Sequence, residues 1–352
     1  MSAPPKIRVL VVDDSAIVRK VISDILSSDT DIEVVGTAPD PYVARDKILA
    51  LHPDVLTLDI EMPRMDGLTF LDRIMRFHPL PVIVISSLTQ SSTRAALEAL
   101  TRGAVDVLAK PGGPYSVGDL KLDLPHRIRA AARAHLRQPA APPPTPTPAA
   151  ATVKPASVST GTPNRLIAIG ASTGGTQAIE QILTHLPRNM PPIVVTQHIP
   201  AGFSTAFAER LNRVCALDVQ EARGGEVLRS GLALIAPGNF HLIVERHSGG
   251  VWRTRLDEGP KVCYQRPSVD VMFQSVCSAA ASATIAVLLT GMGNDGAEGM
   301  AALRKAGAAT IAQNEATCVV FGMPREAIRL DAAQHILPLN EIAQRLIRPS
   351  RC

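Results

Sequence analysis

The first 137 residues alternate five times between a short β-branched run and a stretch with helical periodicity. The predicted strands are 7–12, 31–38, 54–60, 81–86 and 104–110, and the predicted helices are 16–26, 41–51, 67–77, 93–103 and one that ends at residue 136. Helices that return the chain between consecutive strands predict a parallel, doubly wound α/β sheet. In such sheets, ligands bind outside the carboxyl ends of the strands.

The residues after about 165 alternate in the same way, but less regularly. The predicted strands are 165–170, 191–197, 232–237, 284–289 and 309–313, and the predicted helices are 176–186, 204–212, 269–281 and 297–307. The runs 241–246 and 251–257 flank the sequence HSGG and predict an antiparallel hairpin. This half is therefore expected to be a second α/β domain with a mainly parallel sheet.

Residues 138–164 separate the two halves and are rich in Pro, Ala, Thr and Ser, without an aromatic residue. Such a segment cannot bury enough apolar surface to fold, and its prolines favour an extended spacer. We therefore predict a first domain over residues 1–137, a linker over 138–164 and a second domain over 165–352.

The composition excludes several classes of protein. The net charge of +4 is mild, so a nucleic-acid partner is not expected. The five cysteines are scattered without a CxxC pair, which argues against a disulfide framework or a zinc site and indicates a reducing compartment. No apolar run approaches the length of about 18 residues that a membrane span requires. The sequence predicts a cytoplasmic protein that does not insert into a membrane.

Polar residues gather at the predicted carboxyl edge of the first sheet. Three carboxylates on one rim repel each other unless a hard cation such as Mg²⁺ lies among them. A carboxylate is also able to accept a phosphoryl group. The alternative is that these aspartates cap helices. The group comprises Asp13 and Asp14 after the first strand, Asp59 after the third, Ser86 at the end of the fourth and Lys110 after the fifth.

This constellation resembles the receiver domains of bacterial response regulators, over residues 7–136. The resemblance implies a flavodoxin-like (βα)₅ fold. One departure is Val107, which stands three positions before the lysine, where family members often carry an aromatic switch residue. The resemblance implies a role for each residue of the group: phosphoacceptor for Asp59, Mg²⁺ binding for Asp13, Asp14 and Asp59, and phosphate recognition for Ser86 and Lys110.

The second domain contains the pattern G-x-S-x-G at residues 170–174, between a predicted strand and a predicted helix. This pattern is typical of a nucleophile elbow that exposes Ser172, although a glycine-rich turn at a helix start also suits an anion. His198 follows the next strand, and Asp295 lies in a glycine-rich loop after a later strand. If these strands are parallel neighbours, the three side chains converge as nucleophile, general base and orienting carboxylate.

Other assignments remain open at this point. His241 competes with His198 as the base, and Asp295 alone fits a helix cap. The segment RPSVDVMF, with Arg266 and Asp270, either shapes a substrate groove or is a capped helix after a proline turn. The chain order Ser, His, Asp differs from the Ser, Asp, His order of α/β-hydrolases, so that fold is not assigned.

The second domain is joined to a receiver-like domain, and six of its segments resemble the chemotaxis methylesterases of the CheB family: IGASTGG, QHIPAGF, IAPGNFHL, RPSVDVMF, LLTGMGNDGAEG and AQNEATCVVFGMPREAI. The resemblance covers nearly the whole chain except the linker. It implies a triad of Ser172, His198 and Asp295. It also implies an oxyanion donor at the Met292 backbone amide, with Thr173 and Cys318 as pocket residues.

The resemblance further implies an activity and its control. The expected reactions are hydrolysis of glutamate γ-methyl esters on methyl-accepting chemoreceptors and deamidation of certain receptor glutamines, with no cofactor for hydrolysis. A CheA-type histidine kinase would phosphorylate Asp59, and the unphosphorylated receiver would cover the triad. The alternative classes are a second domain that only binds a partner, one that holds a phosphate ligand on the two glycine loops, and a DNA-binding output, for which no helix-turn-helix pattern is found.

Overall fold

The computed structural model describes residues 5–111, 116–136 and 165–348, which form two compact units. The predicted linker over 138–164 lies outside the described residues. The predicted domain boundaries fall at or beside undescribed residues and stay predictions. None of the helices in the described ranges has the length and hydropathy needed to cross a bilayer.

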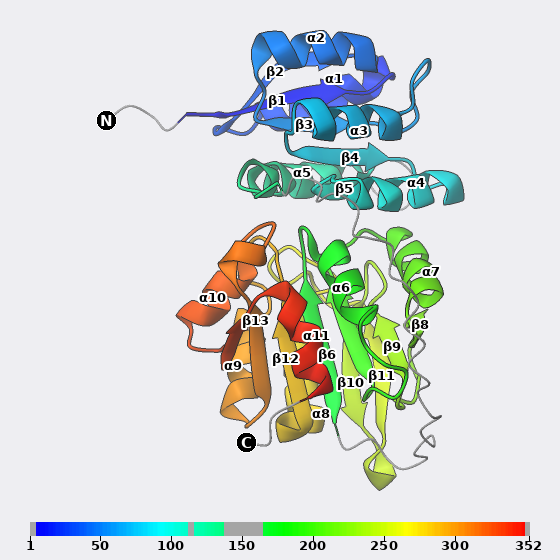
Figure 1. The fold of residues 1–352 in the computed structure, drawn as a ribbon, viewed down its shortest axis with the longest axis vertical. Coiled ribbons are helices and arrows are strands. Elements are labelled where there is room, and N and C mark those ends of the chain that lie inside the picture. Colours follow the sequence, from blue (N-terminus) through cyan, green and yellow to red (C-terminus); the bar gives the residue numbers. More distant parts are fainter. Residues whose placement is uncertain (1–4, 112–115, 137–164, 349–352) are drawn as a thin grey trace, which may run out of the picture. The chain divides into compact units, whose positions relative to one another are not determined.

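The first unit is a five-stranded parallel sheet with helices on both faces. Its strand order is β2-β1-β3-β4-β5, the order of flavodoxin-like folds, which confirms the predicted fold class. The strands are β1 (Ile7–Val12), β2 (Ile32–Ala38), β3 (Val55–Leu58), β4 (Val82–Ser86) and β5 (Asp106–Ala109). The helices are α1 (Ala16–Ser27), α2 (Pro41–Leu51), α3 (Gly67–Phe77), α4 (Gln90–Thr101) and α5 (Val117–Ala132). Figure 1 labels these elements.

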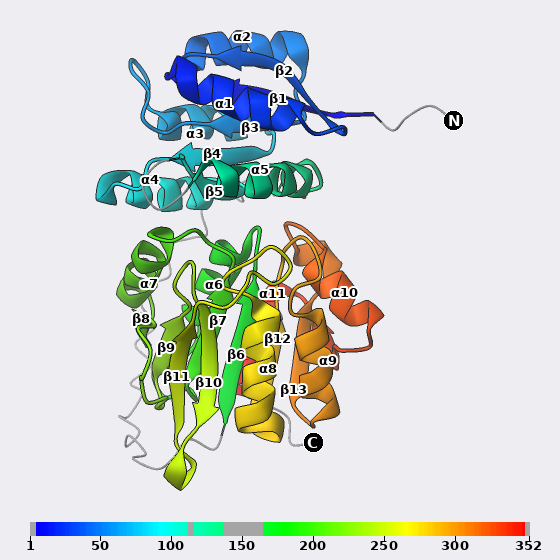
Figure 2. The same cartoon turned by 180° about the vertical axis from the view of Figure 1, so that it is seen from behind.

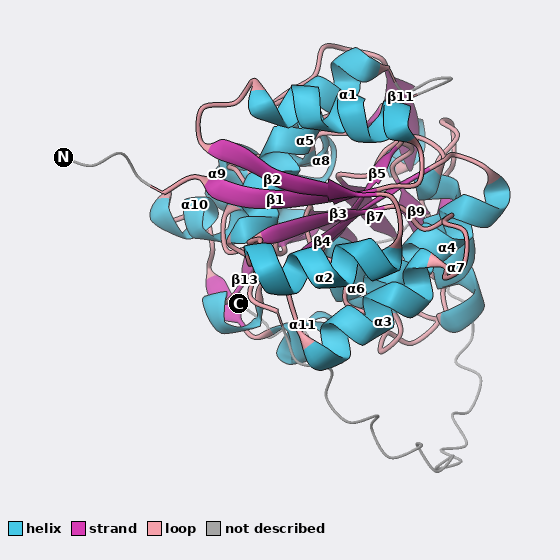
Figure 3. Ribbon diagram, turned by 90° about the horizontal axis from the view of Figure 1, so that it is seen from above, coloured by secondary structure: helices cyan, strands magenta, loops and turns pink. Residues whose placement is uncertain are grey.

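The helices of the first unit divide between the two faces of its sheet, as Figure 3 shows, with α1 and α5 on one side and α2, α3 and α4 on the other. Both faces of the sheet are thereby covered, and every residue of β3, β4 and β5 is buried. This explains why these strands appear in the sequence as mainly apolar runs rather than as alternating patterns.

The second unit is built around a seven-stranded parallel sheet of order β14-β13-β12-β6-β7-β9-β8. The strands are β6 (Leu166–Ala171), β7 (Ile193–Gln197), β8 (Asp218–Glu221), β9 (Leu232–Ile235), β12 (Thr284–Leu288), β13 (Ala309–Gln313) and β14 (His335–Leu337). The predicted hairpin is confirmed as a separate antiparallel pair, β10 (His241–Arg246) and β11 (Trp252–Asp257).

The α-helices of this unit are α6 (Gly175–Leu183), α7 (Phe203–Val214), α8 (Val269–Ala280), α9 (Ala297–Lys305), α10 (Met323–Arg329) and α11 (Leu339–Ile347), and its 3₁₀ turns are η1 (Ser248–Gly250), η2 (Ala281–Ala283) and η3 (Glu315–Thr317). The sequence analysis did not propose α10, α11 or the two edge strands β8 and β14. Figure 2 shows α8 beside the β10–β11 hairpin, where the Trp252 indole N–H donates to the Ala279 carbonyl over 3.1 Å.

Helix α8 packs closely on the central strand β6. A Cβ at Gly170 would lie 2.2 Å from a methyl carbon of Val269, so only glycine fits at this point of the strand. Val269, Met272 and Phe273 are fully buried in the core that forms beneath the helix. This contact brings the N-terminus of α8 to the carboxyl end of β6, where the predicted nucleophile follows.

Candidate active site

Three adjacent parallel strands place the predicted triad at one edge of the larger sheet. Strand β6 pairs with β7 through Ala171 opposite Gln197, and with β12 through Gly170 opposite Leu288. The structure therefore confirms that these strands are parallel neighbours. Their carboxyl ends carry Ser172, His198 and the loop Gly291–Gly296, at a point where the chain turns to opposite sides of β6.

The turn that carries Ser172 is fixed by its backbone. The Ser172 N–H donates to the Thr290 carbonyl at 3.0 Å, and the Ser172 carbonyl accepts from the Gly175 N–H at 2.7 Å and from Gln197 Nε2 at 2.8 Å. Gly174 has φ of +77°, which a residue with a Cβ adopts only at a cost. These contacts hold the strand-to-helix corner in a single conformation.

His198 and Asp295 form a buried pair. His198 Nε2 lies 2.7 Å from Asp295 Oδ2, and both side chains are almost entirely inaccessible to solvent. Because the carboxylate accepts, Nε2 carries the proton, and Nδ1 is the ring nitrogen that is able to take a proton from Ser172. The imidazole thus faces its carboxylate through Nε2, the reverse of the arrangement in chymotrypsin-like proteases.

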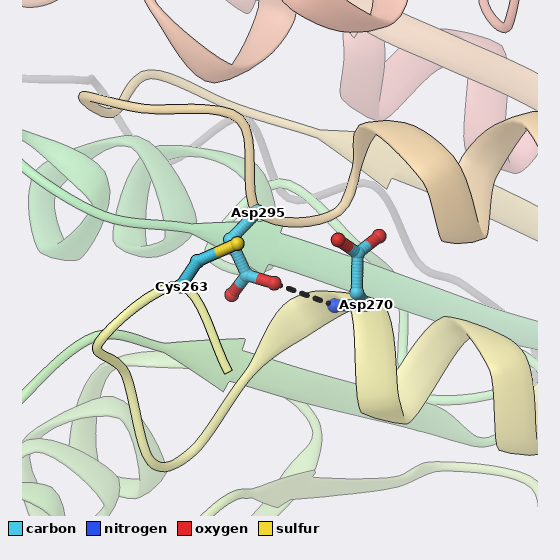
Figure 4. A group of neighbouring side chains, drawn as sticks. All are labelled: Cys263, Asp270 and Asp295. Atoms are coloured by element: carbon cyan, nitrogen blue, oxygen red, sulfur yellow. Dashed lines mark hydrogen bonds between the residues drawn. The ribbon is translucent and has the colours of Figure 1, made fainter. Parts of the chain in front are cut away.

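The start of α8 holds the Asp295 carboxylate. Oδ1 accepts from Ser268 Oγ at 2.7 Å and from the Asp270 N–H at 3.0 Å, and Oδ2 accepts from the Val269 N–H at 2.7 Å. Figure 4 shows the Asp270 N–H directed at this carboxylate. Burial alone would raise the pKa of Asp295, but the hydrogen bond and charge of His198 and the backbone donors outweigh it and hold the pKa below its usual value.

Asp270 caps the next helix in return. Its Oδ1 accepts from the Gly299 N–H in the first turn of α9 at 2.7 Å. Burial raises the pKa of Asp270 to about 6, the Gly299 hydrogen bond opposes the rise, and the charge of Asp295 adds to it. The N-terminus of α8 therefore binds Asp295 while the N-terminus of α9 binds Asp270, and the loop between β12 and α9 is fixed from both sides. The structure places the Asp270 carboxyl at the N-terminal end of α9.

This arrangement predicts a pH-dependent difference in stability between wild type and Asp270→Asn. A folded-state pKa near 6, above the usual 3.8, means that the ionised carboxyl is disfavoured in the folded protein. The asparagine keeps an acceptor for the Gly299 N–H and has no charge. Wild type should therefore lose stability relative to the variant as the pH rises from about 4 to 6. Above pH 6 the difference in their free energies of unfolding should be constant. Urea midpoints of both proteins from pH 4.5 to 7.5 test this, and a constant gap throughout would contradict it.

The residues expected around the oxyanion lie in three loops, which follow β6, β12 and β13. Within the described residues no acceptor is recorded for the Met292 N–H, which leaves this donor available beside the corner of Ser172. The Thr173 carbonyl accepts from Thr290 Oγ1 at 3.0 Å. The Cys318 thiol is buried and directed at the Gln313 carbonyl, 3.9 Å away.

The acidic site of the first unit forms at the predicted edge. Lys110 Nζ lies 2.7 Å from Asp59 Oδ2 and 2.9 Å from Asp13 Oδ2. Carboxylate oxygens of Asp13, Asp14 and Asp59 all lie within 4.8 Å of one another. Burial raises the pKa of Asp59 to about 6, although the Lys110 hydrogen bond and charge oppose the rise. The helix-cap alternative is excluded for these aspartates, since Ser15 caps α1 and Asp66 caps α3.

The sequence analysis also singled out Ser86 and Val107 in this unit. Ser86 Oγ donates to the Ser92 carbonyl at the start of α4 over 3.3 Å, a long and weak bond. Val107 is buried in β5. The phosphate-reading role of Ser86 stays a prediction.

Comparison with known proteins decides the family. The model of the CheB methylesterase family matches residues 167–346, and that of the response regulator receiver domain matches residues 9–117. The chain belongs to the CheB methylesterase family. It is 51% identical over 343 residues to "Protein-glutamate methylesterase/protein-glutamine glutaminase 2" of Syntrophus aciditrophicus, covering 97% of this chain and 99% of that one.

A second curated relative and one solved structure agree with this assignment. The chain is 54% identical to "Protein-glutamate methylesterase/protein-glutamine glutaminase 4" of Anaeromyxobacter dehalogenans, over 98% of this chain and 95% of the other. The crystal structure of the Thermotoga maritima CheB methylesterase catalytic domain is similar with a TM-score of 0.52 and 41% identity, covering 53% of this chain and 98% of that domain.

The CheB-type site contains supporting residues that the sequence analysis missed. Ser268, Gln197 and Thr290 are buried and hold Asp295 or the Ser172 turn. A serine before a helical run signals a helix cap, so Ser268 was recognisable as a cap, but its bond to a carboxylate 27 positions away was not. His241 is excluded as the base, because its Nδ1 accepts from the Ser268 N–H at 3.1 Å and its Nε2 donates to the Pro260 carbonyl at 3.0 Å.

Proposed function

We propose that this chain hydrolyses glutamate γ-methyl esters on methyl-accepting chemoreceptors, releasing methanol, and deamidates specific receptor glutamines, and so supports chemotactic adaptation in the cytoplasm. The observation that carries the proposal is the buried His198–Asp295 pair beside the fixed corner of Ser172, at the ends of three adjacent strands. The names of the relatives support the same substrate class.

The site residues suit an acyl-transfer mechanism. Ser172 Oγ attacks the ester carbonyl carbon while His198 Nδ1 takes the hydroxyl proton, and Asp295 stabilises the imidazolium. The Met292 N–H donates to the oxygen that becomes negative in the tetrahedral intermediate. Collapse breaks the bond to the methoxy oxygen, and His198 returns the proton to give methanol. A water then repeats the sequence on the acyl-enzyme and releases glutamate and free Ser172. A glutamine follows the same route with ammonia as the leaving group.

The receiver unit supplies the control in this proposal. The Asp59 carboxylate attacks the phosphorus of a phosphoryl group carried on the histidine of a CheA-type kinase. The bond from phosphorus to the histidine nitrogen breaks, and the imidazole of the kinase is the leaving group. The carboxylate oxygens of Asp13, Asp14 and Asp59 fit Mg²⁺, which prefers oxygen ligands, and the ion would offset charge on the transferred group. Lys110, already paired with Asp59, would stay close to the phosphoryl oxygens. Phosphorylation then shifts the population toward a state with an accessible triad.

This control predicts that Asp59→Asn loses activation and keeps basal hydrolysis. Methanol release from methylated receptor membranes is measured with and without acetyl phosphate and Mg²⁺. Wild type should respond by roughly 5-fold or more, a typical allosteric coupling, whereas Asp59→Asn should respond by less than about 1.5-fold. Asp46→Asn is a matched control, because Asp46 is an exposed carboxylate paired with its neighbour Arg45. Equal activation of Asp59→Asn and wild type would refute phosphorylation at Asp59.

A further inference from the structure

The first unit has an apolar groove of about 430 Å³ between α2 and α3. Figure 3 shows these two helices on the same side of the sheet. The floor of this α2–α3 groove consists of buried side chains, Ile48 of α2 with Phe70 and Ile74 of α3. Hollows of this volume are typical of binding sites. The groove contains no residue of the triad and none of the acidic site, so the proposed hydrolysis gives it no role.

Large apolar side chains on the walls of the groove stay exposed. Leu49 of α2 is 56% exposed, Phe77 at the end of α3 is 73% exposed, and Tyr42 in the first turn of α2 is 45% exposed. The Arg76 guanidinium lies 5.2 Å from the centre of the Phe77 ring, and that of Arg64 lies 5.7 Å from the centre of the Tyr42 ring. These contacts cover only part of each ring. An apolar hollow edged by exposed apolar side chains is typical of an interaction surface.

The packing of α3 on the sheet accounts for the floor of the groove but not for its edge. Phe70, Ile74 and Phe77 stand at i, i+4 and i+7 and so share one face of the helix. Phe70 and Ile74 are buried, as a helix that covers a sheet requires. Phe77 continues the same row beyond the core, where burial gives no reason for a large ring. Leu49 is likewise exposed, beside the buried Ile48.

The rim of the groove is basic. Among the described residues that line it, the side chains with titratable nitrogens are Arg45, Arg73 and His78, and none is a carboxylate. Arg45 is paired with Asp46 at 2.7 Å. Arg73 is exposed and makes no ion pair or hydrogen bond through its side chain within the described ranges. The complementary ligand is therefore apolar where it enters the groove and anionic on its flank.

Charge and shape select among the possible occupants. A second copy of this chain, bound about a two-fold axis, would bring the same basic rim against itself, which like charges disfavour. Membrane binding relies on apolar faces that project into the headgroup region, whereas the floor of this groove is recessed. A third helix suits the groove, because the side-chain ridges of one helix pack into the grooves that neighbouring helices form.

We propose that the α2–α3 groove binds an acidic amphipathic helix of a partner protein. Apolar side chains of that helix, spaced at i, i+3 or i+4 and i+7, fill the space between Leu49 and Phe77. A glutamate or aspartate on its flank pairs with Arg73. This interaction lies on the receiver unit and goes beyond the proposed hydrolysis, which it does not require.

The test measures peptide binding to the full chain by fluorescence anisotropy. The probe is a fluorescein-labelled peptide of about 18 residues, long enough to form a helix, with Leu along one face and Ala and Glu elsewhere. A second probe carries Lys in place of every Glu. The acidic peptide should bind with a Kd in the micromolar range, and the basic peptide should bind at least about 10-fold more weakly. Added NaCl should weaken the binding of the acidic peptide.

Variants of the groove should weaken binding of the acidic peptide. Leu49→Ser and Phe77→Ser should each raise the Kd about 10-fold, and Arg73→Ala should raise it about 3- to 10-fold. Leu122→Ser is the matched control, because Leu122 is 51% exposed on α5, which covers the other side of the sheet, and this variant should bind like wild type. All four side chains are exposed, so the variants should melt at the wild-type temperature.

Three results would overturn the proposal. One is a failure of wild type to bind the acidic peptide at concentrations up to about 1 mM, the range of weak binding. Another is an equal Kd for wild type and Leu49→Ser, or for the acidic and basic peptides. The third is a different occupant. Phosphatidylglycerol vesicles that bind wild type but not Phe77→Ser would assign the groove to a membrane, and a dimer that Leu49→Ser dissociates in analytical ultracentrifugation would assign it to a second copy.

Discussion

Replacing Ser172 by alanine is expected to lower methanol release from methylated receptors by about 10³-fold or more. The variant retains His198, Asp295 and the Met292 N–H, but no hydroxyl is left to form the acyl-enzyme. The fold should be unaffected, because every recorded hydrogen bond that fixes the corner uses the backbone of Ser172 and not its hydroxyl.

The matched control is Ser278→Ala, which removes a hydroxyl on an exposed part of α8 that donates to the Gln274 carbonyl. It should release methanol at the wild-type rate. The same experiment separates the enzyme from a binding module, because a module would bind receptors with and without Ser172 and release methanol in neither case. Turnover by Ser172→Ala at the wild-type rate would mean that another group is the nucleophile.

Most of the fold was predictable because buried parallel strands leave a strong signal. Runs such as VLVV in β1 and LIAIG in β6 are apolar along their whole length, since both faces of each strand are covered there. The elements that escaped prediction lack that signal. Strand β8 is a four-residue edge strand, Asp218–Glu221, with three polar residues, and β14 has only three residues. Helix α11 follows Pro338 and has no side-chain cap.

The sequence predicted those residues of the candidate site whose positions follow from the ends of the strands. Ser172 and His198 directly follow neighbouring strands, so their proximity follows from parallel pairing. The choice between His198 and His241 did not follow from the sequence, because it depends on which hydrogen bonds each ring makes. Both nitrogens of His241 are engaged by backbone groups of Pro260 and Ser268, and these contacts depend on packing between distant segments.

Replacing Asp295 by asparagine should lower kcat for methanol release by about 10³- to 10⁴-fold. Each oxygen of the carboxylate accepts two donors. If the new amide nitrogen replaces Oδ2, it faces the Val269 N–H and leaves His198 Nε2 without an acceptor that fixes its proton there. The ring then favours the tautomer with a proton on Nδ1, which is unable to take the proton of Ser172.

In the opposite orientation the amide nitrogen would replace Oδ1 and face the Asp270 N–H, which would then lack an acceptor. Either way a buried donor is left unsatisfied, at a cost of about 1–3 kcal/mol, so Asp295→Asn should also unfold at a lower urea concentration than Ser172→Ala.

Asp270→Asn is the control for Asp295→Asn, since it changes a buried carboxyl of the same cluster without touching the proton of His198, and its kcat should stay within about 10-fold of wild type. An Asp295→Asn enzyme that kept more than a tenth of wild-type kcat would show that His198 needs no carboxylate to hold its tautomer. The N-terminus of α8 would then fix the loop between β12 and α9 without any effect on the base. Contacts other than Asp295 would have to orient the His198 imidazole.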